Sequence, residues 1–263
     1  MTDAHLEADG VTVTLSDGTT GRFDLVIGAD GIRSGVREHF WPEVTPEYSG
    51  FGVWRSVHRR PEALTDKYML MSEGKRLGIM PISADRLYIF GTVAEPTNPR
   101  YEKAAWPTLM RTQFAEFGGP VRPFLDELDA CAEILYTAVE EIRLPAPWHR
   151  GRVLLIGDAA HAATPFMGQG GAMAVRDAVE LAAMLDRTTD VEQTLATFGA
   201  RRAAMCRFVQ DVSRRVGEAG AQRGAALHER KITAMRETAQ RQVDDFYAEL
   251  DRLEADTSWP HSS

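Results

Sequence analysis

The 263-residue chain lacks any apolar run long enough to cross a membrane. A membrane-spanning helix needs about 20 consecutive apolar residues, and charged residues interrupt every apolar stretch well before that length. The first residues are acidic and polar, so we expect no signal peptide. The sequence therefore predicts no membrane partner.

Cysteine and net positive charge are also scarce. Cys131 and Cys206 do not have the spacing of a metal site, so we assign no metal ligand. We expect both thiols to stay reduced, which favours a cytoplasmic location. The net charge is -8 and no basic patch stands out, so we expect no nucleic-acid partner. With 44% hydrophobic and 26% charged residues, the composition is otherwise that of an ordinary globular protein.

The most informative stretch is residues 151–178, GRVLLIGDAAHAATPFMGQGGAMAVRDA. Its apolar run at 153–156 is long enough for a buried strand and too short for a helix. Gly157 ends the run, and Asp158 follows at the strand's carboxyl end. Open α/β sheets bind ligands at that end of their strands. The stretch is therefore the first candidate for a binding site.

A glycine cluster and a helix follow this turn. Glycines let a ligand approach the backbone closely, and the unpaired N–H groups of a helix's first turn favour negative charge. A carboxylate nearby can accept a hydrogen bond from a ligand hydroxyl. Together these features suit a cofactor with a sugar-alcohol chain and an electron-poor ring that becomes anionic on reduction. The residues concerned are Gly157, Asp158, Pro165, Gly168, Gln169, Gly170 and Gly171.

The glycine cluster has two alternative interpretations. A Rossmann phosphate loop is disfavoured, because Met173 stands where the third small residue belongs and a long loop separates the glycines from the strand. An ordinary glycine-capped helix start is the plainer alternative. His161 is interpreted as a structural hydrogen-bonding residue rather than a catalytic base. The helix should bury an apolar face formed by Ala172, Val175, Val179, Ala182 and Leu185.

Residues 9–27 predict a β-hairpin. Apolar residues alternate with polar ones from Val11, Asp17-Gly18 is a strong turn signal, and Phe23 begins the return strand. A buried strand at 25–27 should then end at Gly28.

The run DLVIGADGIRSGVR continues this strand into a turn and a helix start. Asp30 can accept hydrogen bonds at the strand end, and Arg33 and Arg37 can pair with phosphate. Considered alone, the segment is equally consistent with a surface turn carrying solvated arginines. We take Asp30, Gly31 and Arg33 as candidate cofactor residues.

Residues 48–145 predict a separate sheet layer built from short β-like runs. Helical segments at 106–117 and 123–130 interrupt it, and a last strand is expected at 134–142. Beyond residue 190, apolar residues from Leu195 to Val216 indicate a long amphipathic helix. A heptad-like seam from Ile232 to Leu253 follows, and its partner is the chain's own core or a second copy, with a solvent-facing helix as the alternative.

Two of these stretches together resemble the group A FAD-dependent monooxygenases, the family of p-hydroxybenzoate and salicylate hydroxylases. The second FAD motif of that family is G-D-A-A-H, a proline, G-Q-G and a helix ending in D-A. The matching residues are Gly157, Asp158, Ala159, Ala160, His161, Pro165, Gly168, Gln169, Gly170, Asp177 and Ala178. The run G-A-D-G-I-R-S-x-V-R resembles the family's D-G motif, and the two motifs occur in the family's order.

The resemblance implies an α/β fold: the later part of a Rossmann-like FAD/NAD(P)-binding fold, with an inserted substrate-binding sheet and C-terminal helices. Residues 1–47 and 146–190 would form a partial FAD-binding domain, residues 48–145 the substrate sheet, and residues 191–263 a helical segment. In the family the Asp contacts the ribityl chain of FAD, so Asp158 and residues 168–171 are implied cofactor residues.

The resemblance also implies candidate residues for a substrate pocket above the flavin. For any one of them, core packing is the plainer interpretation, and Arg55 fits an anionic substrate, the flavin or a surface salt bridge. The candidates are Trp54, Arg55, Met69, Met71, Met80 and Phe90.

The family's first unit, a strand followed by G-x-G-x-x-G, has no counterpart in this sequence. We therefore expect a split, truncated or shortened form, with weak or no FAD binding by the chain alone. We also expect a free sheet edge, which favours pairing with an N-terminal half-protein or self-association.

The implied reaction is hydroxylation of a small aromatic substrate through a flavin hydroperoxide, with NADH or NADPH as electron donor. No catalytic side chain is assigned. The alternative is a non-catalytic partner or regulatory subunit that keeps the fold.

Overall fold

The computed structural model describes residues 1–130, 133–187 and 189–256, so Cys131 lies outside the described residues. The chain forms two compact units. The first unit comprises residues 1–47, 140–216 and the described residues after 237, and the second comprises residues 48–139 and 217–237. The C-terminal segment is thus not a unit by itself, because residues 217–237 belong to the second unit and the described residues on either side of them belong to the first.

The first unit begins with the predicted hairpin. Strands β2 (Val11–Thr14) and β3 (Thr20–Phe23) pair in antiparallel register, with Gly18 in the turn at φ 83°. This prediction is confirmed. A further strand, β1 (Asp3–Leu6), pairs with β2 and was not predicted, because four residues of mixed polarity carry little pattern.

A second small sheet positions both sequence motifs. Strand β4 (Val26–Gly28) pairs in parallel with β11 (Val153–Leu155), and β10 (His149–Arg150) covers the other edge of β11. Parallel pairing brings Gly28 and Leu155 to the same end of the sheet. The turns that follow the two strands, each of which carries a sequence motif, therefore start side by side. β11 is fully buried as predicted, whereas Ile27 of β4 is 42% exposed, because β4 is an edge strand of the described sheet.

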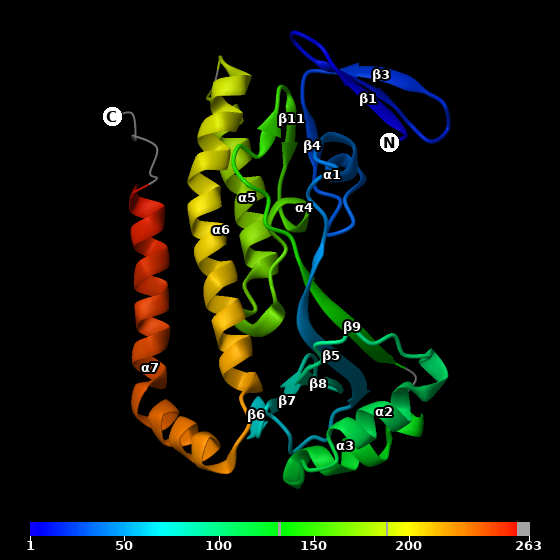
Figure 1. Ribbon diagram of the computed structural model, residues 1–263, viewed down its shortest axis with the longest axis vertical. Coiled ribbons are helices and arrows are strands. Elements are labelled where there is room, and N and C mark those ends of the chain that lie inside the picture. Colours follow the sequence, from blue (N-terminus) through cyan, green and yellow to red (C-terminus); the bar gives the residue numbers. More distant parts are fainter. Residues whose placement is uncertain (131–132, 188, 257–263) are drawn as a thin grey trace. The chain divides into compact units, whose positions relative to one another are not determined.

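Helices enclose this sheet within the first unit, and Figure 1 shows α5 and α6 running alongside each other. The core combines residues of β11 with Phe198, Met205 and Val209 of α6 and with Phe246 and Leu250 of α7. The helices are α1 (Gly35–Phe40), α4 (Asp158–His161), α5 (Gly170–Leu185), α6 (Val191–Ala221) and α7 (Ala225–Asp256), with a 3₁₀ turn at Pro165–Met167.

The C-terminal seam packs on its own chain at one end only. Phe246 of α7 stacks on Phe208 of α6 with ring centroids 5.5 Å apart. Met235 and Val243, which belong to the same predicted seam, are 41% and 48% exposed. The seam therefore packs on the chain's own core near Phe246, and it faces solvent at Met235 and Val243.

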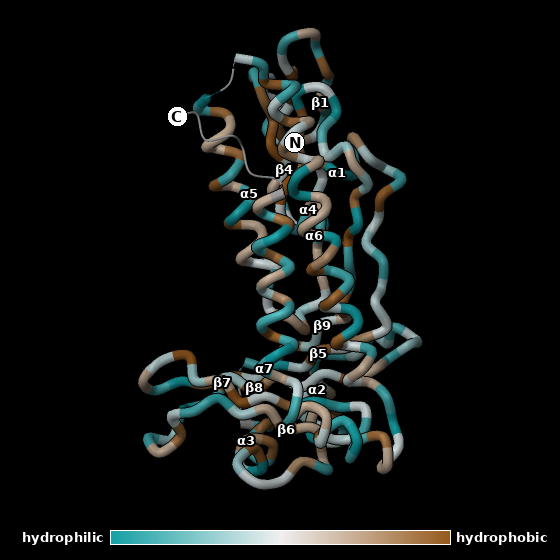
Figure 2. The backbone as a smooth tube through the Cα atoms, turned by 90° about the vertical axis from the view of Figure 1, so that its left-hand side faces the viewer, coloured by the Kyte–Doolittle hydropathy of each residue, from teal (hydrophilic) through white to brown (hydrophobic). Residues whose placement is uncertain are grey.

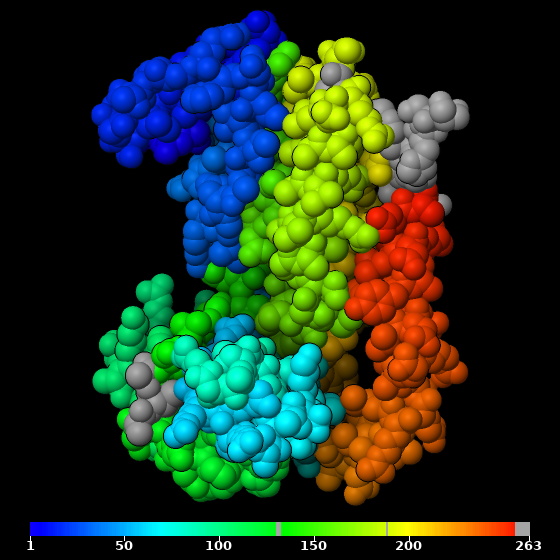
Figure 3. Space-filling view, turned by 180° about the vertical axis from the view of Figure 1, so that it is seen from behind, coloured from blue at the N-terminus to red at the C-terminus, as the bar shows by residue number. Residues whose placement is uncertain are grey.

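The prediction for the buried face of α5 is wrong. Val175 and Val179 are 65% and 66% exposed, whereas Met173, Leu181 and the intervening Asp177 are buried. Figure 3 shows α5, in yellow-green, lying open along the face of the first unit. The helix is apolar on both faces, so spacing alone could not decide which face meets the core.

The second unit is a five-stranded sheet with the order β6-β7-β8-β5-β9. The helical turns after β8 cover one of its faces and form a second core. The strands are β5 (Glu47–Arg59), β6 (Tyr68–Ser72), β7 (Lys75–Pro81), β8 (Arg86–Ala94) and β9 (Ile134–Glu141). The helices are α2 (Trp106–Gln113) and α3 (Arg122–Asp126), with 3₁₀ turns at Lys103–Ala105, Gly119–Val121 and Leu128–Ala130.

The described helices include none that is both long and apolar enough to span a bilayer. Hydrophilic residues are interspersed along each long helix, as the hydropathy colours of Figure 2 show.

The two faces of α5 make a testable contrast. Leu181→Ala should lower the free energy of unfolding by about 2–5 kcal/mol, because it opens a cavity in the core. Val179→Ala, on the open face of the same helix, should change it by less than about 0.5 kcal/mol. Urea unfolding of both variants measures the difference, and equal effects would contradict the orientation of α5.

Candidate functional site

The turn after β11 requires glycine. Gly157 has φ 59° and ψ -146°, a conformation in which a side chain is strained. A Cβ there would also stand 3.2 Å from the Cβ of Ala174. Asp158 follows as the first residue of α4 and is exposed. Within the described part of the chain its carboxylate has no hydrogen-bond or ion-pair partner, so it is free to bind a ligand hydroxyl.

The glycine cluster borders open space. Gly168 ends the 3₁₀ turn that starts at Pro165, with a left-handed φ of 64°. A Cβ added at Gly168, Gly170 or Gly171 would meet no atom within 4 Å. No side chain caps the first turn of α5, although Gln169 occupies its N-cap position. The helix start can therefore present its N–H groups to a ligand, as predicted for an anionic ring edge.

The turn after β4 is built by Asp30. Its Oδ2 accepts hydrogen bonds from the backbone N–H groups of Gly35 (2.8 Å) and Val36 (3.2 Å), at the start of α1. Gly31 supplies the positive φ of 79° that the turn needs. Arg33 is 67% exposed and pairs with Glu140. Asp30 thus shapes the turn, and Arg33 is the accessible cation beside it.

Arg37 is structural, which corrects its interpretation as a phosphate ligand. It is 3% exposed and donates to the carbonyl oxygens of Ile32 (2.6 Å), Val44 (3.1 Å) and Ala159 (2.9 Å). Burial lowers the pKa of its guanidinium. The bond to Ala159 joins α1 to α4, so Arg37 ties together the two turns that follow the parallel strands.

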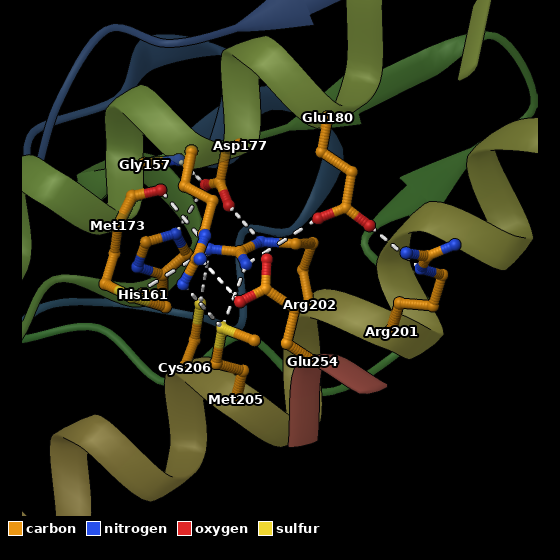
Figure 4. Close-up of polar contacts among 11 residues, drawn as sticks. Gly157, His161, Met173, Asp177, Glu180, Arg201, Arg202, Met205, Cys206 and Glu254 are labelled. Atoms are coloured by element: carbon orange, nitrogen blue, oxygen red, sulfur yellow. Dashed lines mark hydrogen bonds and ion pairs between the residues drawn. The ribbon is translucent and has the colours of Figure 1, made fainter. Parts of the chain in front are cut away.

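A buried carboxylate lies beneath the second turn. Asp177 is 0% exposed, and its Oδ2 accepts from the N–H of Gly157 (2.8 Å) and from Nε2 of His161 (2.6 Å). Its Oδ1 accepts from Nε of Arg202 at 2.6 Å (Figure 4). The ring of His161 also stacks on Trp148 at 5.2 Å. The prediction that His161 is a structural hydrogen-bonding residue is confirmed.

This network was missed from the sequence. The available signal was an acidic residue, Asp177, between apolar positions four residues away on either side, Met173 and Leu181. Such a residue on a buried helix face needs a partner. Nothing in the sequence identified that partner as Arg202, which lies 25 residues further along the chain.

The same cluster has the composition of a metal site but not its electrostatics. Ligand atoms of His161, Asp177 and Cys206 lie within 4.8 Å of one another. Arg202 already donates to the carboxylate, however, and its Nη2 is 3.9 Å from the Cys206 sulfur. Because a guanidinium occupies the cationic position, the arrangement is a hydrogen-bonded network rather than a metal centre.

The network also sets the protonation of its members. Burial is the largest single influence on His161 and lowers its pKa, but the hydrogen bonds and charge interactions with Asp177 and Cys206 together outweigh it and raise that pKa to about 10. Burial opposes the charge of Asp177, yet His161 and Arg202 together lower the pKa of this carboxyl. The folded protein therefore favours a charged pair.

In the second unit, five of the candidate pocket residues share the sheet face opposite the helices. Arg55 on β5 is paired with Phe90 on β8. Phe90 is paired in turn with Gly78 on β7, and Gly78 with Met69 on β6, so these positions share one face of the sheet. Met71 and Met80 occupy the same face by strand alternation. The sheet therefore brings together Arg55, Met69, Met71, Met80 and Phe90.

Trp54 does not belong to this group. It is 1% exposed and packs in the helix-covered core against Tyr101, Tyr136 and Trp106, with centroids 5.5, 4.7 and 6.4 Å away. Its assignment to the pocket is wrong, because adjacent residues of a strand point to opposite faces.

A depression of about 430 Å³ lies beside Arg55 and is lined by Val57, Ile82, Tyr88, Glu133, Ile134 and Leu135. Burial lowers the pKa of the Arg55 guanidinium. Its side chain donates to Thr137 Oγ1 at 3.3 Å, whereas Glu133 pairs with Arg86. Among the described residues, Arg55 has no acidic partner. An anion that entered the depression would supply one.

Parallel strands that end in a free carboxylate and an uncapped, glycine-rich helix start define a nucleotide-cofactor-binding protein of the α/β class. The chain belongs to the FAD binding domain family, whose model matches residues 1–213. The resemblance to the aromatic-ring monooxygenases is thereby confirmed.

Two bacterial relatives each match 81% of this chain. The chain is 39% identical to the 2-heptyl-3-hydroxy-4(1H)-quinolone synthase of Pseudomonas aeruginosa over 217 residues, which are 81% of this chain and 56% of that protein. It is 35% identical to an FAD-dependent urate hydroxylase of Klebsiella pneumoniae over 218 residues, which are 81% of this chain and 55% of that protein. The chain therefore spans little more than half the length of these relatives.

The fold is likewise shared with solved flavoproteins. The Klebsiella pneumoniae HpxO complexed with FAD and uric acid matches with a TM-score of 0.82 at 30% identity, over 96% of this chain and 65% of that one. A salicylate hydroxylase substrate complex matches in fold, with a TM-score of 0.75 at 23% identity, over 100% of this chain and 71% of that one.

The raised pKa of His161 predicts a pH dependence of stability. Because the folded state holds this proton more tightly than the unfolded state, the stabilisation is complete below pH 6.5 and is lost as the pH rises through about 10. The free energy of unfolding should fall over that window by at most about 1.4 kcal/mol per pH unit for one proton.

Urea unfolding between pH 6 and pH 10 measures this slope. His161→Gln should flatten it, whereas His5→Gln, which alters an exposed imidazole, should leave it unchanged. A slope that persists in His161→Gln would show that another group titrates.

Proposed function

We propose that this chain supplies part of the FAD site and the substrate-facing sheet of a flavin-dependent monooxygenase that hydroxylates a small aromatic compound. The free carboxylate of Asp158, at the carboxyl end of a buried parallel strand, is the observation that carries the proposal. FAD, when bound, would supply oxygen activation with electrons from NADH or NADPH. We further propose a cytoplasmic enzyme, in keeping with its two isolated cysteines.

The described residues fit FAD in three ways. Asp158 can accept a hydrogen bond from a hydroxyl of the ribityl chain. The open backbone at residues 168–171 and the uncapped start of α5 can face the pyrimidine edge of the ring and stabilise negative charge there. Asp30, Gly31 and Arg33 form the neighbouring turn, where Arg33 can reach a phosphate. No described side chain is assigned as an acid or base.

We also propose that a segment outside these 263 residues completes the site, either in the same polypeptide or as an N-terminal half-protein. The open edge of β4, with Ile27 exposed, and the exposed apolar face of α5, with Val175 and Val179, support this. Apolar surface of this kind is typical of an interface. Self-association through the same edge is the competing outcome.

The proposed substrate is a small, flat anion. The depression beside Arg55 is mainly apolar and offers one partly desolvated cation without an acidic partner among the described residues. Apolar walls suit an aromatic ring, and a guanidinium suits a carboxylate or an ionised hydroxyl. Uric acid, the compound bound together with FAD in one structural neighbour, is a small, flat compound of this type.

A non-catalytic partner or regulatory subunit is the alternative function. The complete protein would then bind FAD weakly or not at all, and NAD(P)H would not be consumed with any aromatic substrate.

The role of Asp158 can be tested by FAD titration of the chain and of its completed form, followed by flavin absorbance and fluorescence. Asp158→Ala should weaken FAD binding by about tenfold or more, because a hydrogen bond to a charged group is lost. Asp186→Ala, at the exposed far end of α5, is the matched control and should bind as the unaltered chain does. Unaltered affinity in Asp158→Ala would reject the assignment.

The role of Arg55 can be tested by substrate binding. Arg55→Met should raise the Kd for an aromatic carboxylate about tenfold or more, and should leave binding of the corresponding neutral amide unchanged. Arg59→Met is the control, since Arg59 lies on the same strand but is exposed. Calorimetry with both ligands separates loss of charge recognition from loss of fold.

A further inference from the structure

The N–H of Gly157 has an unusual partner. Strand pairing accounts for the preceding residue, since the N–H of Ile156 donates to the carbonyl of Gly28. At Gly157 the chain turns away from the sheet, and its N–H donates instead to the Asp177 carboxylate, 20 residues further along. A side chain from α5 therefore fixes the turn on which Asp158 stands.

Arg202 holds this carboxylate from the opposite side. It is 1% exposed, donates from Nε to Asp177, and donates from Nη2 to the carbonyl of Met173 at 3.3 Å. Met173 lies in the first turn of α5, two residues after the glycine cluster. One guanidinium thus contacts both the carboxylate that fixes the turn and the backbone of the helix start, as Figure 4 shows.

Three hydrogen-bond donors hold the carboxylate of Asp177 in one orientation. Its two oxygens accept from three groups, on β11's end, on α4 and on α6. A buried carboxylate with several charge-assisted hydrogen bonds is held more rigidly than one with a single partner. Neither Asp177 nor Arg202 is accessible, so neither can touch a ligand.

We propose that Asp177, held by Arg202, is a positioning residue that sets the Gly157–Asp158 turn and the start of α5 before any cofactor binds. The identity of the ligand as a cofactor rests on the proposed function, whereas the positioning of the turn does not. The network would exclude alternative backbone conformations at Gly157, which glycine would otherwise adopt readily. Asp158 would then meet a ligand without a prior rearrangement.

Amide hydrogen exchange of the 263-residue chain tests this directly at Gly157. Asp177→Asn and Arg202→Met should each speed exchange of the Gly157 amide by about tenfold or more, relative to the amides of the β2–β3 hairpin. Arg201→Met is the matched control. Arg201 is the neighbour of Arg202 on α6 and pairs with Glu180, but it does not contact Asp177.

Two outcomes overturn the proposal. One is that exchange at Gly157 rises only in step with global unfolding, which would make the network a source of general core stability. The other is that Arg201→Met has the same effect as Arg202→Met. If Arg202→Met does not fold, Arg202→Lys keeps the charge without the forked geometry and should give a smaller, local increase at Gly157.

FAD affinity adds a second readout that keeps the two proposals apart. In the completed protein, Asp177→Asn should weaken FAD binding while the exchange of the hairpin stays unaltered. Suppose that Asp177→Asn speeds amide exchange at Gly157 but Asp158→Ala binds FAD as tightly as the unaltered protein. That result would uphold the positioning role and reject the FAD assignment. If instead Asp177→Asn leaves amide exchange at Gly157 unaltered and Asp158→Ala weakens FAD binding, the FAD assignment would stand and the positioning role would be rejected. Added Zn²⁺ should change neither readout, and Zn²⁺-dependent protection at Gly157 would reject the network in favour of a metal site.

Discussion

Parallel pairing of two three-residue strands places the candidate site, because the turns that follow β4 and β11 contain half of the implied cofactor residues and the glycine cluster follows the second turn after α4. The strands lie more than 120 residues apart in the chain, and each is too short to be stable alone. Their pairing depends on packing from the helices and on Arg37, which bonds α1 to Ala159 across the junction. Arg37, in the motif that follows β4, therefore helps to hold the motif that follows β11 in place, whether or not the first motif also contacts a ligand.

The buried Asp177–Arg202 pair also holds backbone groups of the candidate site in place. Ionised groups in a protein interior are destabilising unless each finds a partner. Here the Asp177 carboxylate lies between two cationic partners, His161 and Arg202. The remaining hydrogen bonds of Asp177 and Arg202 are directed at backbone groups of Gly157 and Met173. Charge compensation and positioning are thus achieved by the same side chains. An apolar replacement could fill the space but could not hold those backbone groups.

The two faces of the second unit's sheet have different surroundings. One face carries Trp54 and the apolar residues that pack under α2 and α3. The other carries Arg55, Phe90 and the candidate methionines, and it has a shallow depression of its own. Strand alternation alone separates Trp54 from its neighbour Arg55, so a one-residue change of register would exchange their roles.

The sequence by itself determined the hairpin, the strands at the motifs, the last strand of the sheet and the structural nature of His161. These are local: a turn signal, a short apolar run or a motif suffices for each. Only the tertiary structure decided which face of α5 is buried, that Trp54 is core, that Arg37 binds carbonyl groups, and that Asp177 meets Arg202. Those outcomes depend on groups distant in sequence, and a helix apolar on both faces or a lone buried charge gives no local sign of its partner.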